Sequence, residues 1–87
     1  MNGKLNIEDL EDSVIYDLFY ESATHLGAIY LRKEREARKN GDIELYNQLH
    51  DEEFAMLDER DSIASHDREA QIACKRKWDD RARELRG

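Results

Sequence analysis

The sequence of 87 residues contains no proline, one cysteine and four glycines, of which only Gly27 and Gly41 lie away from the chain ends. The single cysteine, Cys74, excludes an internal disulfide, so nothing in the sequence indicates an oxidising compartment. Without proline, the chain must turn at glycine or at polar turn residues. It therefore has few places at which a helix can end.

Long hydrophobic runs are also missing. No apolar stretch approaches the roughly 18 residues of a membrane-spanning helix, and the N-terminus lacks the basic start and apolar centre of a signal peptide. We therefore expect no membrane association and a cytoplasmic location, in the host cytoplasm if a phage encodes the protein.

Apolar residues are scarce relative to charged ones. Hydrophobic residues make up 39% and charged residues 40% of the chain, against about 45–50% and 25% in average soluble domains. So short a chain buries only about 60% of the surface that it exposes when unfolded. We expect one small domain, residues 1–87, with a thin core that a second copy completes in a homodimer.

Charge is distributed in blocks along the chain. The net charge is −7; residues 31–41 hold five basic and two acidic side chains, whereas residues 42–61 hold one basic and eight acidic ones. A net negative charge argues against direct nucleic-acid binding, which needs a basic footprint. The C-terminal segment "KRKWDDRARELR" is a minor alternative for such binding, although three acids interrupt it.

The firmest local prediction is a chain reversal over residues 40–42. Gly41 can adopt the left-handed conformation that closes a helix, and Asp42 can cap the next one. A first helix is predicted over residues 7–39, with Asn6 as its N-cap, because apolar residues recur at helical spacing from Leu10 to Tyr30. No segment shows the alternating pattern of a strand.

A second helix is predicted over residues 43–85, along an apolar line that starts at Leu45. Two arrangements fit this segment: one unbroken helix, or a break near residues 62–65, where Ser62 and Ser65 can act as caps. The unbroken form is favoured, because the proline-free pattern continues through Ala64. The fold class is thus all-α: an antiparallel hairpin of two long helices, or three helices if the break occurs.

The end of the second helix extends beyond the reach of the first. In a hairpin that closes at residues 40–42, residue i lies opposite about residue 81−i, so no part of the first helix reaches Trp78, Ala82 and Leu85. We expect these three residues to mediate self-association. The same rule places Arg60, a charge within the apolar line, opposite Glu21, and predicts a register-fixing ion pair between them.

No catalytic, metal or cofactor site is predicted. The histidines are His25, His50 and His66, and none has a partner histidine one turn away or the glutamate three residues before it that a di-iron bundle uses. Cys74 lies on the apolar line and is interpreted as a buried small hydrophobe rather than a nucleophile.

The acidic block between Asp42 and Asp61 is the most informative feature for function. Glu44, Asp51 and Asp58 repeat every seven residues and therefore share one face of a helix. Carboxylates on successive turns lie about 5–6 Å apart, which is comparable with the phosphate spacing of a nucleic-acid strand. The predicted partner-binding residues are Glu44, Asp51, Glu52, Asp58, Glu59 and Asp61.

Our leading hypothesis is a non-enzymatic protein-binding module, a small acidic inhibitor that occupies a basic nucleic-acid-binding surface of a partner protein. Small phage and mobile-element anti-defence proteins share its size, acidity and helicity. The alternative is a self-assembling structural or adaptor protein, in which the acidic face only maintains solubility.

Overall fold

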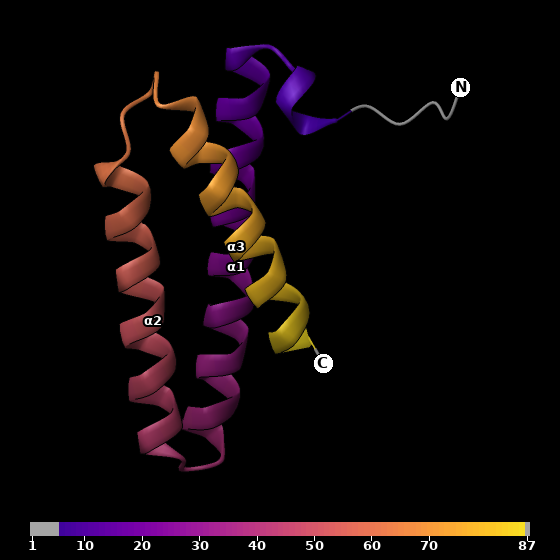
Figure 1. Ribbon diagram of the computed structural model, residues 1–87. Coiled ribbons are helices and arrows are strands. Elements are labelled where there is room, and N and C mark those ends of the chain that lie inside the picture. Colours follow the sequence, from indigo (N-terminus) through magenta and orange to yellow (C-terminus); the bar gives the residue numbers. More distant parts are fainter. Residues whose placement is uncertain (1–5, 87) are drawn as a thin grey trace.

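The computed structural model describes residues 6–86, and these contain helices and no strand, as the all-α prediction requires (Figure 1). A 3-10 turn, η1, precedes three α-helices. The bounds of these elements are Ile7–Asp9 for η1, Asp12–Lys39 for α1, Ile43–Ser62 for α2 and Arg68–Arg86 for α3.

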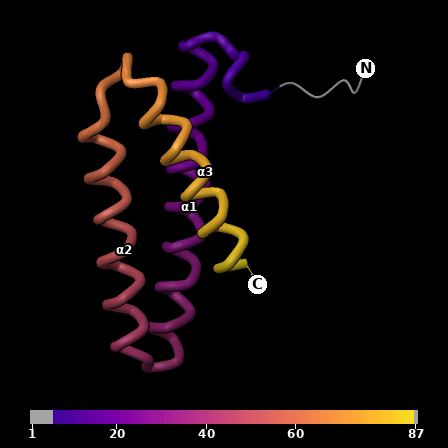
Figure 2. The backbone as a smooth tube through the Cα atoms, in the orientation of Figure 1, coloured from indigo at the N-terminus to yellow at the C-terminus, as the bar shows by residue number. Residues whose placement is uncertain are grey.

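The helices form a flat, elongated layer around α1. α2 runs antiparallel to α1, and α3 then returns across α1 and diverges from α2 (Figure 2). α1 makes the close backbone contacts with both other helices. The Cα atoms extend over 50 × 31 × 14 Å, so the layer is little thicker than one helix, whose diameter is about 10–12 Å.

The turn between α1 and α2 lies where the sequence places it. Gly41 has φ +73°, the left-handed conformation that glycine adopts without a steric penalty. The amide of Asp42 donates to the carbonyl of Ala37 at 2.8 Å. The Asp42 carboxylate accepts a hydrogen bond from the amide of Leu45 at 3.1 Å, so Asp42 caps α2 as predicted.

The favoured prediction of one unbroken helix over residues 43–85 is wrong, and the alternative with a break is the observed one. α2 ends at Ser62, and Ile63 is extended. The cap of the new helix is Asp67, whose carboxylate accepts from the amide of Ala70 at 3.2 Å. Ser62 instead donates its hydroxyl to the carbonyl of Glu59.

Gln71 holds this connection in place. Its side chain is only 1% exposed, and its amide nitrogen donates to the carbonyls of Ala64 and Ser65, each at 3.0 Å. These bonds satisfy backbone carbonyls that a continuous helix would have paired internally. The apolar pattern alone did not reveal this, because Gln71 reads as a polar surface residue.

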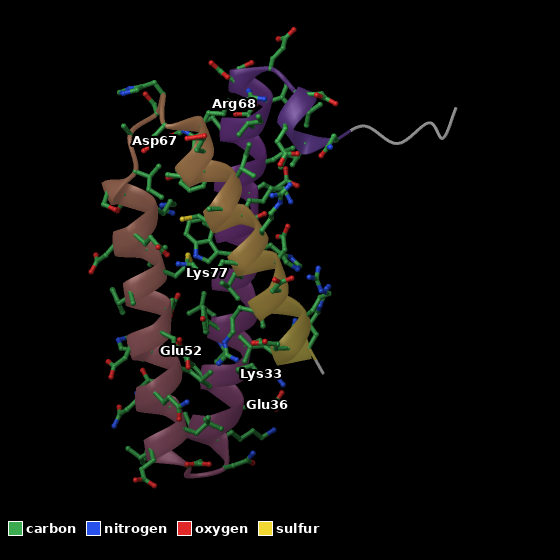
Figure 3. The ribbon with its side chains drawn as sticks, viewed as in Figure 1. Lys33, Glu36, Glu52, Asp67, Arg68 and Lys77 are labelled. Carbon is green, nitrogen blue, oxygen red and sulfur yellow. The ribbon has the colours of Figure 1, made fainter. Side chains whose placement is uncertain are left out.

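Helix 1 also starts later than predicted, at Asp12 rather than at residue 7. Asn6 makes no side-chain cap, and the backbone at Leu10 and Glu11 is extended. The reason is tertiary: Arg68, at the start of α3, donates to the carbonyl of Glu8 and to the Asp12 carboxylate (Figure 3). This contact draws the segment before α1 across the end of α3.

The core lies where α1 faces the other two helices. Phe19 of α1 stacks on Trp78 of α3 with ring centroids 5.2 Å apart. The buried cluster consists of Phe19, Ala23, Leu26, Ile29, Tyr30, Leu49, Met56, Cys74, Trp78 and Ala82. Trp78 and Ala82 are 3% and 2% exposed, and Leu85 packs against the cluster. The break lets α3 fold onto α1, so the premise that these three residues need a second copy is wrong.

Candidate functional site

The predicted acidic face separates into two groups in the structure. Glu44, Asp51, Asp58 and Asp61 are exposed. The first three form no ion pair with any residue between positions 6 and 86, whereas Asp61 pairs with Arg60 at 3.0 Å. The outer side of α2 therefore presents three carboxylates that no described cation neutralises.

Glu52 and Glu59 instead face α3. Glu52 accepts from the Arg81 guanidinium at 2.8 Å, and Glu59 pairs with Lys77 at 2.7 Å. Lys77 and Arg81 lie one turn apart on α3, and each reaches a carboxylate of α2; Glu52 and Lys77 are labelled in Figure 3. In this structure both carboxylates are therefore engaged in ion pairs with α3.

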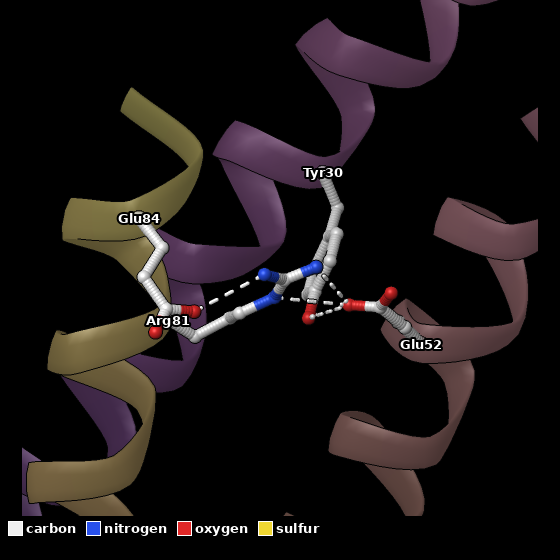
Figure 4. A network of polar contacts seen from close by, with 4 residues as sticks. All are labelled: Tyr30, Glu52, Arg81 and Glu84. Atoms are coloured by element: carbon white, nitrogen blue, oxygen red, sulfur yellow. Dashed lines mark hydrogen bonds and ion pairs between the residues drawn. The ribbon is translucent and has the colours of Figure 1, made fainter. Parts of the chain in front are cut away.

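Arg81 is the centre of a polar cluster that joins all three helices (Figure 4). Its guanidinium donates twice to one oxygen of Glu52 and once to Glu84, at 2.8–3.1 Å. The Tyr30 hydroxyl donates to the same Glu52 oxygen at 3.2 Å. The hydrogen bond to Glu52 raises the pKa of Arg81, and burial raises the pKa of the Tyr30 hydroxyl.

A groove of about 510 Å³ lies between α2 and α3. Its lining includes Leu26, Met56 and Trp78, and the Glu52–Arg81 and Glu59–Lys77 ion pairs lie along it. An apolar floor with a charged rim is the usual composition of a ligand groove. In this conformation, however, the two ion pairs join the helices across it.

All basic side chains of α3 except Arg86 form ion pairs within the described part of the chain. Arg68, Lys75, Arg76, Lys77, Arg81 and Arg83 each form an ion pair with a carboxylate of the described residues. A nucleic-acid backbone would have to displace these acids. The arrangement therefore gives little support to the minor alternative of nucleic-acid binding through this segment.

The predicted Arg60–Glu21 ion pair is replaced by other contacts. Arg60 pairs with Asp61, and its guanidinium lies 4.7 Å from the ring centroid of Tyr20. Tyr20 precedes Glu21 directly, so the predicted register was correct to within one residue. Arg60 therefore contacts the aromatic ring of Tyr20 rather than the carboxylate of Glu21.

Three polar side chains that were not predicted as a site meet between α1 and α2. Glu34 of α1 is 5% exposed, Glu53 of α2 is 9% exposed, and His50 is partly buried beside them. His50 Nδ1 lies 3.7 Å from Glu34 Oε1. Burial, together with the smaller effect of the neighbouring Glu34 carboxylate, raises the pKa of Glu53 to about 7.

A signal for this cluster was present in the sequence. Glu34 follows the buried Tyr30 by four residues, so it lies on the buried face of α1. The di-iron pattern has a glutamate three residues before the histidine, whereas Glu53 lies three residues after His50. Both patterns place the two side chains on neighbouring positions of one helical face.

Cys74 is buried, as predicted, and its pKa is raised by burial. No helix within residues 6–86 has both the length and the apolarity needed to cross a membrane.

A scan against protein-family models found no match, and neither a search of curated proteins nor one of solved structures found a significant match.

Proposed function

We propose that the protein is a non-enzymatic protein-binding module whose α2 surface occupies a basic, nucleic-acid-binding surface of a partner protein. The observation that carries the proposal is the set of three exposed carboxylates, Glu44, Asp51 and Asp58, which have no ion-pair partner among residues 6–86. Among the other acids of the same helix, Glu52 and Glu59 are paired with α3, Asp61 is paired with Arg60, and Glu53 is buried.

These carboxylates form a regularly spaced row, whose neighbouring members lie two turns apart rather than on the successive turns that match the phosphate spacing. They repeat every seven residues on a helix of 20 residues, so neighbouring members lie about 10.5 Å apart along the axis. A helix keeps this spacing fixed, and a partner therefore meets a preorganised row of negative charge.

Phe54 adds an apolar contact to the acidic row. It is 51% exposed, and it lies three residues after Asp51 and four before Asp58, so the three side chains are neighbours on the helix surface. A solubilising face does not need a half-exposed aromatic residue, whereas a protein interface gains most of its binding energy from a few such residues.

The test compares two variants with equal changes in charge. The face variant carries Glu44→Gln, Asp51→Asn and Asp58→Asn. The control variant carries Asp17→Asn, Glu21→Gln and Glu69→Gln, which remove three exposed carboxylates from α1 and α3. Both variants are used to capture partners from a lysate of the source organism at low and high salt.

We expect wild type and the control variant to retain a basic nucleic-acid-binding protein at low salt and to release it at high salt, because exposed charges are screened. The face variant should not retain it. The purified partner should then bind its nucleic acid less tightly when wild-type protein is added. Equal capture by both variants, or no competition with nucleic acid, would contradict the proposal.

A self-assembling role is the second candidate. It depends on an exposed side of α2 rather than on Trp78, Ala82 and Leu85. Ile43 and Phe54, which share one side of α2, are 57% and 51% exposed, and two copies can cover these side chains by pairing. Light scattering at tens of micromolar decides between the roles. A dimer that Phe54→Ser converts to a monomer supports self-assembly, and a monomeric wild type contradicts it.

A further inference from the structure

The cluster of Glu34, His50 and Glu53 leaves buried polar atoms without partners. Glu34 Oε2 and His50 Nδ1 are both inaccessible to solvent, and neither forms a hydrogen bond within the described chain. Such atoms are uncommon in native proteins, because each has lost its hydration without gaining a replacement. The Glu34 side chain as a whole is almost entirely buried.

No described lysine or arginine compensates these acids. The only ion-pair contact that Glu34 makes among residues 6–86 is with His50, and Glu53 makes none. Two adjacent carboxylates within a helix interface are unfavourable unless a proton or another cation lies between them. The cluster thus lacks a positive charge.

We propose that Glu34, His50 and Glu53 bind one divalent transition-metal ion, such as Zn²⁺, between α1 and α2. One ligand atom from each residue can be chosen so that all lie within 4.8 Å of one another. Ligands bound to Zn²⁺ at 2.0–2.2 Å in tetrahedral geometry lie about 3.4 Å apart. The 3.7 Å between His50 Nδ1 and Glu34 Oε1 is already close to that value.

The donor set determines the class of ion. An imidazole nitrogen favours zinc, iron, nickel or copper, whereas magnesium and calcium prefer sites made only of oxygen. Three protein ligands leave further coordination positions for water, as in open zinc sites. We therefore expect Zn²⁺ to bind much more tightly than Mg²⁺.

The surroundings of His50 orient its ring and leave a path for the ion. Tyr46 stacks on the ring at 5.7 Å, and Phe54 meets it edge-on at 4.6 Å between centroids. Its Nδ1 atom is directed into the cluster while the side chain remains 42% exposed. An ion can therefore reach the two buried carboxylates past one partly exposed ligand.

The test is calorimetric titration of the full chain with Zn²⁺ and, separately, with Mg²⁺. We expect one Zn²⁺ per chain, a higher melting temperature with Zn²⁺, and at least tenfold weaker Mg²⁺ binding. Glu34→Gln, His50→Ala and Glu53→Gln should each weaken Zn²⁺ binding at least tenfold. Each variant is first shown by circular dichroism to keep its helix content.

Matched controls separate this site from adventitious binding. His25→Ala and His66→Ala remove exposed histidines, and Glu36→Gln removes an exposed carboxylate of α1; all three should bind Zn²⁺ as wild type does. No binding at 100 µM Zn²⁺ would overturn the proposal. So would binding that persists in folded Glu34→Gln, because a surface histidine alone would then explain it.

Discussion

At the scale of single residues, Glu53 has the carboxyl group whose ionisation the fold opposes most clearly. It is buried in the α1–α2 interface beside Glu34, and both burial and that neighbour favour its protonated form. Its pKa of about 7 in the folded chain compares with an ordinary value of 4.5. Between these two values the folded chain holds a proton that the unfolded chain has released.

Stability in the absence of metal should therefore fall as pH rises from about 4.5 to about 7 and stay at the lower level above that. Glu53→Gln removes this loss. We expect the variant to be about 1–3 kcal/mol more stable than wild type at pH 8, and to show little difference near pH 4. Urea unfolding in the presence of EDTA measures both values.

Glu36→Gln is the control for this prediction, because Glu36 is an exposed carboxylate on the same helix. Its substitution should leave the pH dependence unchanged. If Glu53→Gln gave the same difference from wild type at pH 4 and at pH 8, Glu53 would not be the group that titrates.

At the scale of the elements, the connection over residues 63–67 determines the architecture. It converts what would be a long two-helix hairpin into three helices, and it places α3 against α1. Asp67 caps the new helix, and the buried Gln71 side chain donates hydrogen bonds to two backbone carbonyls of the connection. This connection thus depends on polar contacts more than on apolar burial.

Gln71→Ala should destabilise the protein by about 1–3 kcal/mol, because the carbonyls of Ala64 and Ser65 lose their donor and a small cavity forms. Thermal or urea unfolding measures the change. Gln48→Ala is the matched control, since Gln48 is exposed on α2, and it should change stability by less than about 0.5 kcal/mol. An equal effect of the two substitutions would contradict the role assigned to Gln71.

The Glu52–Arg81 pair should couple α2 to α3 measurably. Its side chains are 29% and 34% exposed, and the same carboxylate oxygen also accepts from Tyr30. We expect a double-mutant cycle of Glu52→Gln and Arg81→Met to give a coupling energy of about 0.5–1.5 kcal/mol. The cycle of Glu21→Ala and Arg60→Ala should give none, because Arg60 contacts Asp61 and Tyr20.

Local turn chemistry made part of this fold predictable. Asn40, Gly41 and Asp42 combine a left-handed glycine with a cap, and together they located the first reversal. The second reversal carries no glycine, so the sequence offered it only as an alternative. The start of α1 at Asp12 depends on Arg68, 56 residues further along the chain, and no local pattern contains such a contact.

The candidate site, like the fold, was predictable from the sequence only in part. The heptad spacing of Glu44, Asp51 and Asp58 placed them on one exposed face, since exposure follows from helical periodicity. The inward orientation of Glu52 and Glu59 depends on where α3 lies, and that required the break. The cluster around Glu34 depends on how two helices are paired.

At the scale of the whole molecule, the chain is less compact than its length allows. Its radius of gyration is 15.0 Å, whereas a compact domain of 87 residues has about 12 Å. Much of the core depends on the few large side chains of α1 and α3, of which Trp78 lies centrally against Phe19.

Trp78→Ala should therefore destabilise the protein by about 3–5 kcal/mol, because it leaves a large cavity against Phe19. The stability of wild type should not change with protein concentration if the protein is a monomer in which Trp78 is covered by its own chain. A melting temperature that rises with concentration and loses this dependence in Trp78→Ala would instead indicate a dimer through Trp78. Scanning calorimetry over a hundredfold concentration range distinguishes these outcomes.

Because α1 is the common partner of two helices that otherwise diverge, the molecule contains two cooperative units that share one member. For either outer helix to open from α1 alone, the Glu52–Arg81 and Glu59–Lys77 ion pairs must also break. Native-state hydrogen exchange should then resolve two classes of amides in the outer helices, each with its own opening free energy. The amides of α1 that face both helices should exchange only through global unfolding.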